Sequence, residues 1–358
     1  MLKLEQLIIK NFRGFDDIDI NNLSNINLFI GKNNCGKTSI LESLFLFFGI
    51  SNPELINKMN FFIREINIQD INHLIYFFHK LKYENRPSFE GLFNNNMKRY
   101  LTIEPYIEGS IRTVDKQTDT ATTALQNSEI KGINFNFSIN ENGNEKITHQ
   151  NFLRYNGNNV WEFKSDNRYI LYASFINNVI NDSATKSNFA EIIKRNNKDK
   201  NDILSLLQNF DNNIEDIQVL PDGIYCKLKD IDMLFPINIM GDGIRRFLNI
   251  ITTVLKRQSS FVCIDEIENG LHYSSYKLLW KGLIEFSNKY DIQLFITTHS
   301  IETITCLKSL LEEENYEKTR GFVKIFTVAK TLKKGYQTYG YSFYGFKDAI
   351  DNEAEIRS

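Results

Sequence analysis

The sequence predicts an α/β fold with a mixed sheet, and three observations support this prediction. An apolar run over residues 25–30 leads into a glycine-rich loop and then into the helical pattern of residues 39–48. A second apolar run ends at the acids Asp265 and Glu266, and a third ends near His299. Short apolar strands that end in polar residues and are followed by helical patterns are typical of α/β proteins.

The N-terminal residues read as strands. Residues 2–15 alternate apolar and polar side chains, as a half-buried strand does, and the alternation breaks at Gly14. A second strand is expected over Ile18 to Ile20, and residues 25–30 form the strand that enters the glycine-rich loop.

That loop, G-K-N-N-C-G-K-T, fits the pattern G-x-x-x-x-G-K-S/T at every constrained position. In this pattern the glycines let backbone N–H groups converge on a phosphate, the lysine reaches the β and γ oxygens, and the hydroxyl can ligate Mg²⁺. A strand before the loop and a helix after it are the context that the motif requires. We therefore expect ATP and Mg²⁺ as cofactors, bound by Gly31, Asn33, Asn34, Gly36, Lys37, Thr38 and Ser39.

Residues 51–230 are predicted to form an insertion of mixed strands and short helices that could contact a partner. No heptad pattern lasts for three or four repeats, so no long coiled coil is expected. The expected elements are a helical pattern over residues 63–83, strands over 100–111, 132–139 and 224–228, a flexible loop over 112–129, and two helices within 189–217.

Composition excludes several classes of protein. The 358 residues hold 42 Lys and Arg against 44 Asp and Glu, so the whole chain is not a basic nucleic-acid binder. No apolar run is long enough to cross a membrane, and the four cysteines are too far apart for a zinc site or a disulfide framework. We expect a cytoplasmic protein with reduced cysteines. DNA stays a candidate partner through local basic spots at residues 98–99, 194–195, 198, 200 and 256–257.

The acids that end the run F-V-C-I-D-E have the layout of a metal-held triphosphate site. Asp265 is expected on the metal side, and Glu266 is the expected general base for an attacking water. His299, at the end of the run L-F-I-T-T-H-S, could contact the γ-phosphate, although a surface histidine at a strand end would give the same pattern.

A third segment, Gly241-Asp242-Gly243, precedes a helical apolar pattern, so its backbone N–H groups could bind phosphate at a helix start. A glycine turn that only caps the helix is the alternative. Further along, residues 321–346 read as terminal strands that complete the sheet.

In this order, the segments resemble the ABC-type ATPases of the SMC and RecF group, and most closely the compact AAA-family, OLD-like ATPases of prokaryotic defence and repair loci. The motif N-F-R-G-F at residues 11–15 matches the opening of that group, and I-D-E-I-E-N-G-L-H-Y at residues 264–273 matches its Asp-Glu segment. The ending at residues 355–357 is also similar. The resemblance covers residues 1–50 and 235–305.

The resemblance implies an ATPase lobe of residues 1–50 and 231–358, and a head-to-head homodimer with ATP between the protomers. Gly241, Asp242 and Gly243 would then act on the partner's nucleotide, residues 268–271 would link the two sites, and Arg13 would lie near the nucleotide. Two departures stand out. The usual Ser-Gly-Gly is Gly-Asp-Gly here, so Arg245 or Arg246 could take over the trans contact, and the metal-contacting glutamine has only Gln69 as a candidate.

The preferred function is an ATPase whose nucleotide-dependent dimerisation controls a separate effector in anti-phage defence or DNA repair. An ATP-gated scaffold with little turnover is one alternative. A self-contained nuclease is the other, but the acids of the insertion that it would need are spread over helix-like and turn segments and form no cluster: Asp199, Asp202, Asp211, Glu215 and Asp216.

Overall fold

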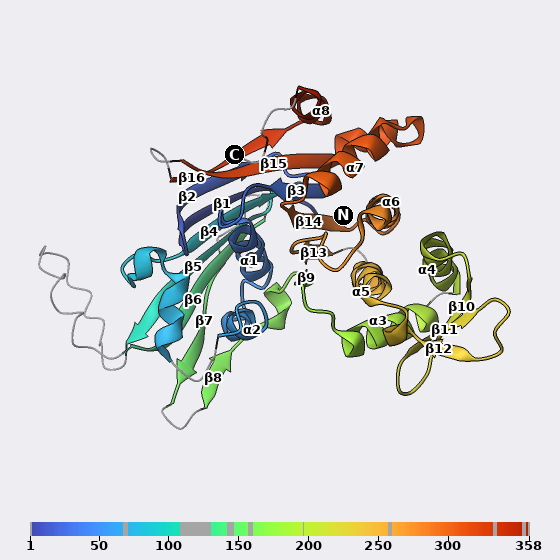
Figure 1. Ribbon diagram of the computed structural model, residues 1–358. Coiled ribbons are helices and arrows are strands. Elements are labelled where there is room, and N and C mark those ends of the chain that lie inside the picture. Colours follow the sequence, from blue (N-terminus) through green and yellow to red (C-terminus); the bar gives the residue numbers. More distant parts are fainter. Residues whose placement is uncertain are drawn as a thin grey trace, which may run out of the picture. The chain divides into compact units, whose positions relative to one another are not determined.

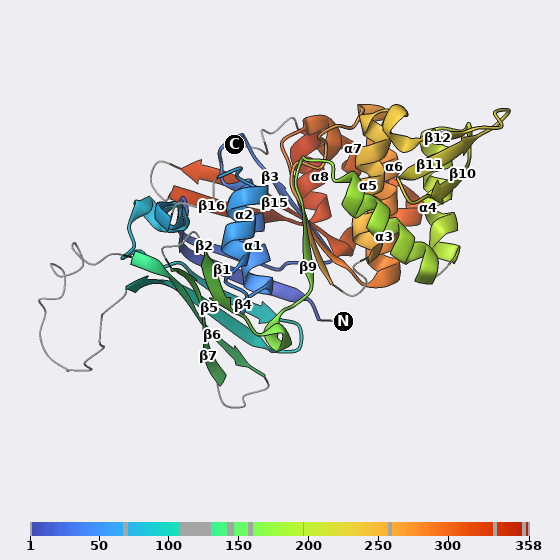
Figure 2. The same ribbon diagram turned by 90° about the horizontal axis from the view of Figure 1, so that it is seen from below.

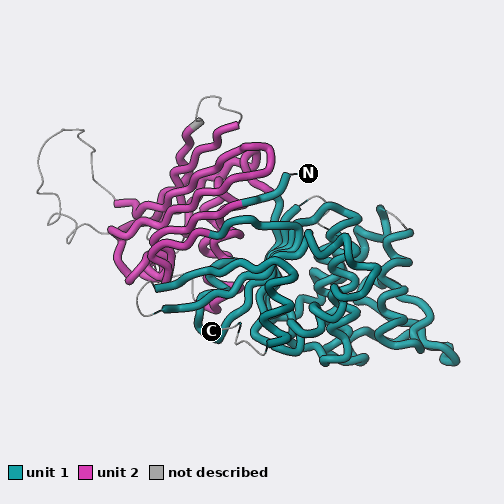
Figure 3. The backbone as a smooth tube through the Cα atoms, turned by 90° about the horizontal axis from the view of Figure 1, so that it is seen from above, with its two compact units in different colours: residues 1–5, 20–41, 172–358 teal, residues 6–19, 42–171 magenta. Residues whose placement is uncertain are grey.

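The computed structural model describes residues 2–66, 71–107, 130–141, 147–156, 160–195, 197–256, 260–331, 335–352 and 356. The chain forms two compact units, shown in Figure 3. The first holds residues 1–5, 20–41 and 172–358, and the second holds residues 6–19 and 42–171. The functional division into residues 1–50 with 231–358 and residues 51–230 stays a prediction.

A six-stranded sheet in the order β16-β15-β3-β14-β13-β9 forms the centre of the first unit (Figure 1). The five strands from β15 to β9 run parallel, and β16 is antiparallel to β15. The sheet is therefore mixed, and the predicted α/β class is confirmed. The strands are β3 (Ile26–Ile30), β9 (Ala173–Ile176), β13 (Phe261–Ile264), β14 (Gln293–Thr298), β15 (Val323–Thr331) and β16 (Gly335–Tyr341).

Helices and a small sheet complete the first unit (Figure 2). The helices are α3 (Asp182–Arg195), α4 (Asn197–Phe210), α5 (Asp242–Lys256), α6 (Tyr276–Tyr290), α7 (Ile301–Glu312) and α8 (Phe343–Asp351). The small antiparallel sheet consists of β10 (Ile214–Val219), β11 (Ile224–Leu228) and β12 (Leu234–Pro236).

One hydrophobic core joins the large sheet to its helices. Ile26, Leu28 and Ile30, on one face of β3, belong to a buried cluster that also contains side chains of α5, α6 and α7. The residue between them, Phe29, points to the other face and stacks on Phe326, with 5.2 Å between ring centroids. Burial on both faces explains why every residue of β3 except Asn27 is apolar.

The second unit contains a seven-stranded sheet in the order β2-β1-β4-β5-β6-β7-β8. The strands from β4 to β8 pair antiparallel. Phe12 and Phe89 pack edge to face in its core, and Phe47 stacks on Phe93. The elements are β1 (Leu4–Phe12), β2 (Phe15–Asn21), β4 (Ser88–Phe93), β5 (Lys98–Ile107), β6 (Ile130–Asn140), β7 (Ile147–Tyr155), β8 (Trp161–Lys164) and α2 (Leu55–Phe62). Helix α1 (Lys37–Phe48) contributes residues to both units.

Most predicted elements lie within a few residues of the observed ones, and two predictions are wrong. The helical pattern expected over residues 63–83 is replaced by short 3₁₀ turns over Ile71–Phe77 and His79–Leu81. The terminal strands are present, but helix α8 follows them and was not predicted. The loop predicted over residues 112–129 lies outside the described residues.

The structure describes no long coiled coil, as expected. Within the described ranges, no helix combines the length and apolar character needed to cross a membrane. All four cysteines are free thiols, and three of them are buried. Burial raises the pKa of the Cys226 thiol to about 12, which keeps it protonated and unreactive.

Candidate functional site

The parallel strands β3, β14 and β13 are neighbours in the sheet and end at the same edge. The phosphate-loop sequence follows β3, the acids Asp265 and Glu266 follow β13, and His299 follows β14. Segments more than 200 residues apart in the sequence therefore meet at the carboxyl ends of adjacent strands, which is where open α/β sheets bind ligands.

The loop after β3 packs too tightly for side chains at its first glycine. A Cβ on Gly31 would lie 2.4 Å from the Val328 carbonyl oxygen and 2.6 Å from the Cys35 sulfur. Helix α1 begins at Lys37, whose buried ammonium donates to the carbonyls of Gly31 and Lys32 at 2.8 Å each. The third N–H of the ammonium faces the sulfur of Cys35 at 3.8 Å, which is only a weak acceptor. Of the other predicted loop residues, Asn33 and Asn34 are exposed and Ser39 is half-buried on α1.

Two threonines hold the carboxylate of Asp265. The Thr38 hydroxyl lies 2.9 Å from Asp265 Oδ2, and the Thr297 hydroxyl donates to Oδ1 at 2.6 Å. Thr38 comes from the phosphate loop and Thr297 comes from β14. The metal-side residues proposed from sequence, Thr38 and Asp265, are therefore in direct contact.

Glu266 has an unusual backbone conformation, with φ at 47°. Its N–H donates to the Thr297 hydroxyl at 2.8 Å, and its carboxylate accepts from the Asn269 side chain at 2.5 Å. Left-handed conformations are rare in residues other than glycine and are concentrated at functional sites. These two contacts hold the backbone and the side chain of Glu266 in place beyond the end of β13.

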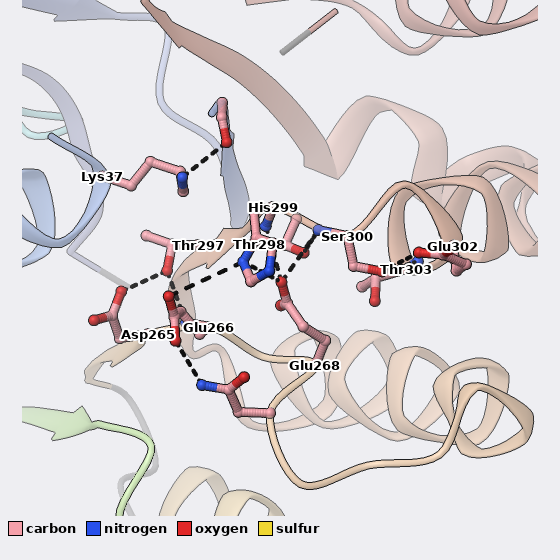
Figure 4. A network of polar contacts seen from close by, with 12 residues as sticks. Lys37, Asp265, Glu266, Glu268, Thr297, Thr298, His299, Ser300, Glu302 and Thr303 are labelled. Atoms are coloured by element: carbon pink, nitrogen blue, oxygen red, sulfur yellow. Dashed lines mark hydrogen bonds and ion pairs between the residues drawn. The ribbon is translucent and has the colours of Figure 1, made fainter. Parts of the chain in front are cut away.

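His299 lies between two carboxylates, as Figure 4 shows. Its Nδ1 is 3.0 Å from Glu268 and 4.0 Å from Glu266. The backbone N–H groups of His299 and Ser300 both donate to Glu268, at 2.9 and 3.1 Å. The three catalytic residues proposed from sequence, Lys37, Glu266 and His299, thus lie in segments that meet at this edge.

A buried cation lies next to this cluster of acids. The guanidinium of Arg246, on α5, is fully buried and donates to the carbonyls of Asn177 and Asp265. Burial lowers the pKa of Arg246 to about 10, and the carboxylates of residues 265–268 oppose this shift. Because it is buried, Arg246 cannot make the trans contact that the sequence left open for it.

The start of helix α5 is more exposed than the sheet edge that carries the acids. Gly241 has φ at 102°, and a Cβ placed on it would meet no atom within 4 Å. The Asp242 side chain is 73% exposed and accepts from Arg245, which also pairs with Asp182. Gly243 lies close to Gly270, because a Cβ placed on Gly243 would be 3.6 Å from the Gly270 carbonyl oxygen. The predicted signature segment is therefore an exposed helix start beside the loop of residues 268–271.

Arg13 belongs to a separate ion-pair network in the second unit. Its Nε lies 2.6 Å from the fully buried carboxylate of Glu42, which also accepts from Arg64 at 2.7 Å. Burial lowers the pKa of Arg13, and Glu42 opposes that shift. The predicted position of Arg13 near the nucleotide stays a prediction. Gln69, the candidate glutamine, lies outside the described residues.

Most of the acids considered for a nuclease, and some of the basic residues considered for DNA binding, are ion-paired among the described residues. Buried Asp199 pairs with Arg195, and Lys200 pairs with Asp216. Asp202, Glu215 and Lys256 also have partners of opposite charge. Arg99 is fully buried and cannot contact DNA. The described ranges contain no group of three or more His, Cys, Asp or Glu that could hold a metal.

Sequence reasoning assigned no role to Thr297, and for Arg246 it offered only the trans contact, not the buried position beside the acids. A threonine within a buried strand carries no motif of its own, and an arginine on an apolar helix reads as a surface residue. The only available signal for Thr297 was its place in the strand that ends at His299.

A sequence profile for the family described as "AAA domain, putative AbiEii toxin, Type IV TA system" matches residues 26–305. This match spans well over half of the chain and runs from strand β3 to helix α7. The chain belongs to this family. The phosphate loop, the acids after β13 and His299 all lie inside the matched part of this AAA-domain protein.

Two curated relatives extend the comparison of the AAA-domain protein. An ATP/GTP phosphatase of Helicobacter pylori is 26% identical over 335 residues, which cover 87% of this chain and 90% of the relative. The DNA replication and repair protein RecF of Lactococcus lactis is 44% identical over 43 residues, or 12% of each chain.

A solved SMC head, bound to the C-winged helix domain of ScpA, has a similar fold. The TM-score is 0.50 at 12% identity, and the alignment covers 97% of this AAA-domain protein and 99% of the SMC head. Together, the family, the relatives and the fold confirm the predicted resemblance. The AAA-domain protein is an ATPase of the ABC type found in the SMC and RecF group.

Proposed function

We propose that this ATPase hydrolyses ATP between two copies of the chain and that the change in dimer state controls a separate cytoplasmic effector. The observation that carries the proposal is the contact of Asp265 with both Thr38 and Thr297. This contact ties the phosphate loop, the acid strand and the His299 strand into one site.

The arrangement fits Mg²⁺ and a triphosphate. Magnesium prefers hard oxygen ligands and is usually held by one or two protein groups together with phosphate oxygens and water. Thr38 and Asp265 would supply the protein oxygens. When bound, the ion neutralises charge on the phosphates.

The roles of the remaining residues follow from their positions. Lys37 would turn the N–H that faces the weakly accepting Cys35 sulfur toward a phosphate oxygen. Glu266, oriented by Asn269, would accept a proton from the attacking water, and His299 would contact the γ-phosphate. Each group is held by a neighbour before any ligand arrives, and such preorganisation favours the transition state.

The dimer is supported by the open start of α5. Backbone N–H groups at a helix start can bind an anion, and the space beside Gly241 leaves room for a phosphate from a second chain. Two large apolar side chains shortly before it, Met233 and Ile239, are 64% and 66% exposed. Exposed apolar residues beside an open anion site are typical of a protein interface.

The effector and its pathway are supported by the relatives. The family description includes a toxin of a type IV toxin-antitoxin system, which favours defence, and the short RecF match favours DNA repair. The SMC head was solved with a partner domain, ScpA, bound to it. We propose that this ATPase likewise acts through another protein, with residues 51–230 as the contact region.

Replacing Glu266 by Gln tests the proposal. The variant keeps the shape of the side chain but cannot accept a proton, so hydrolysis should fall by about 100-fold or more. ATP and Mg²⁺ should then hold a stable dimer, measured by sedimentation velocity with and without nucleotide. Glu285→Gln, a substitution on helix α6, serves as the matched control.

The result separates the candidate functions. Lost hydrolysis with a trapped dimer supports the proposed cycle. Negligible turnover in both wild type and variant, with dimerisation by ATP in both, favours the gated scaffold that the altered signature would permit. A chain that stays monomeric with ATP in both forms refutes the dimer.

A further inference from the structure

We propose that Glu268 is a positioning residue for hydrolysis, because it holds His299 in place at the edge of the sheet. The proposal rests on the γ-phosphate role suggested above for His299. It assigns a task to the third acid of the segment D-E-I-E, which neither binds the metal nor serves as the base in the proposed function.

The contacts of Glu268 converge on one short segment. One oxygen, Oε1, accepts the backbone N–H groups of His299 and Ser300 and also lies 3.0 Å from the imidazole Nδ1. The carboxylate therefore holds the backbone at His299 through hydrogen bonds and lies within ion-pair distance of the ring of the same residue (Figure 4). Hydrogen bonds to an ionised acceptor are about twice as strong as neutral ones.

The location of the carboxylate strengthens these contacts. The Glu268 side chain is only 7% exposed, whereas the ring of His299 is 41% exposed. A buried charge is stable only when several donors surround it, so this carboxylate needs the His299 segment in its observed position. The exposed part of the ring stays accessible to a ligand.

The backbone keeps Glu268 itself from moving. The N–H of Ile267 donates to the Thr297 carbonyl at 3.1 Å, so the acid loop is bonded to β14 directly before His299. On the other side, Ser300 caps α7 by accepting the N–H of Thr303. Glu268 bonds to the backbone of His299 and Ser300, which lies between the Ile267–Thr297 hydrogen bond and the helix cap.

A second acid at the same helix start provides a matched control. Glu302 accepts the hydroxyl of Ser300 at 2.8 Å, and the pair is exposed. Glu268 and Glu302 both lie beside Ser300, and Glu268 also accepts the backbone N–H of His299 and lies near its ring. Removal of either carboxylate changes the charge by the same amount.

The test is a double-mutant cycle on ATP hydrolysis. Glu268→Ala should lower kcat by roughly 10- to 100-fold with a small change in KM, since a displaced catalytic group costs about this much. Glu302→Ala should leave kcat within about twofold of wild type. Glu268→Gln keeps an acceptor for the two N–H groups and should recover most of the lost kcat. Thermal unfolding of each variant confirms that it is folded.

The cycle distinguishes positioning from a general structural role. If Glu268 acts through His299, the double variant Glu268→Ala/His299→Ala should be no slower than His299→Ala alone. Additive losses, or equal losses in Glu268→Ala and Glu302→Ala, overturn the proposal. If His299→Ala alone hydrolyses ATP normally, the γ-phosphate role itself fails, which is a separate result.

Discussion

At the edge of the six-stranded sheet, Thr38 and Thr297 both contact the carboxylate of Asp265, whereas at the start of helix α5 a Cβ on Gly241 would meet nothing within 4 Å. Both regions belong to the first unit, and both have glycine-rich sequences that suit phosphate. The first is enclosed by contacts from three strands. The second presents one helix end and exposed side chains.

Under the proposed function, this difference means that each chain supplies the hydrolytic residues of one site and offers its helix start to the nucleotide of a second chain. Buried polar groups need partners within the fold, so the acids at the sheet edge are already ordered. The first backbone N–H groups of an exposed helix need no partner within the chain, because water or a ligand can satisfy them. The following predictions test this contrast from the largest effect to the smallest.

The largest effect is expected for Lys37→Ala. The variant removes the N–H donor proposed for the phosphates, so hydrolysis should fall by about 100- to 1000-fold and ATP binding should weaken. Lys32→Ala is the control, because that side chain is exposed on the same loop and only its carbonyl contacts Lys37. Calorimetry and a phosphate-release assay measure both properties. Equal ATP hydrolysis by Lys37→Ala and Lys32→Ala would contradict the assignment of the phosphate site to the sheet edge.

A smaller loss is expected for Thr297→Val. This change removes a donor to Asp265 and an acceptor for the Glu266 N–H while it keeps the volume of the side chain. We expect about 1–3 kcal/mol lower free energy of unfolding and roughly 10-fold slower hydrolysis. The adjacent Thr298→Val, equally buried, loses only its contact with Ser300 and should hydrolyse faster than Thr297→Val. Denaturant unfolding and steady-state kinetics separate the two effects.

The sharpest contrast comes from Gly243→Ala at the start of α5. The new methyl group would meet only ordinary contacts within the chain, and alanine favours a helix over glycine, so stability should rise by up to about 1 kcal/mol. Hydrolysis should nevertheless fall several-fold, because the methyl group would obstruct a second chain's phosphate. Gly321→Ala, at an open position, should leave hydrolysis unchanged. A Gly243→Ala variant that is fully active would argue against a role for this helix start in a composite site.

The sequence predicted the enclosed region well because its function depends on local motifs. The phosphate loop, the acids after β13 and His299 each follow a short apolar strand, and parallel strands bring such ends together. The partners that orient these groups were harder to predict. Thr297 and Arg246 act through long-range contacts that only the sheet order reveals, and the aromatic residues around Ile71–Phe77 suit a helix and a series of turns equally well.

Strand β3 pairs with β14 on one side and β15 on the other, so both of its neighbours lie more than 260 residues further along the chain. During synthesis, the apolar segment Ile26–Ile30 leaves the ribosome long before either neighbour exists. The nascent chain must therefore keep this unpaired and mostly apolar strand from associating with other chains until β14 and β15 have been synthesised. Expression of this ATPase should consequently depend on chaperones that bind exposed strands, and truncation before β15 should yield aggregated protein.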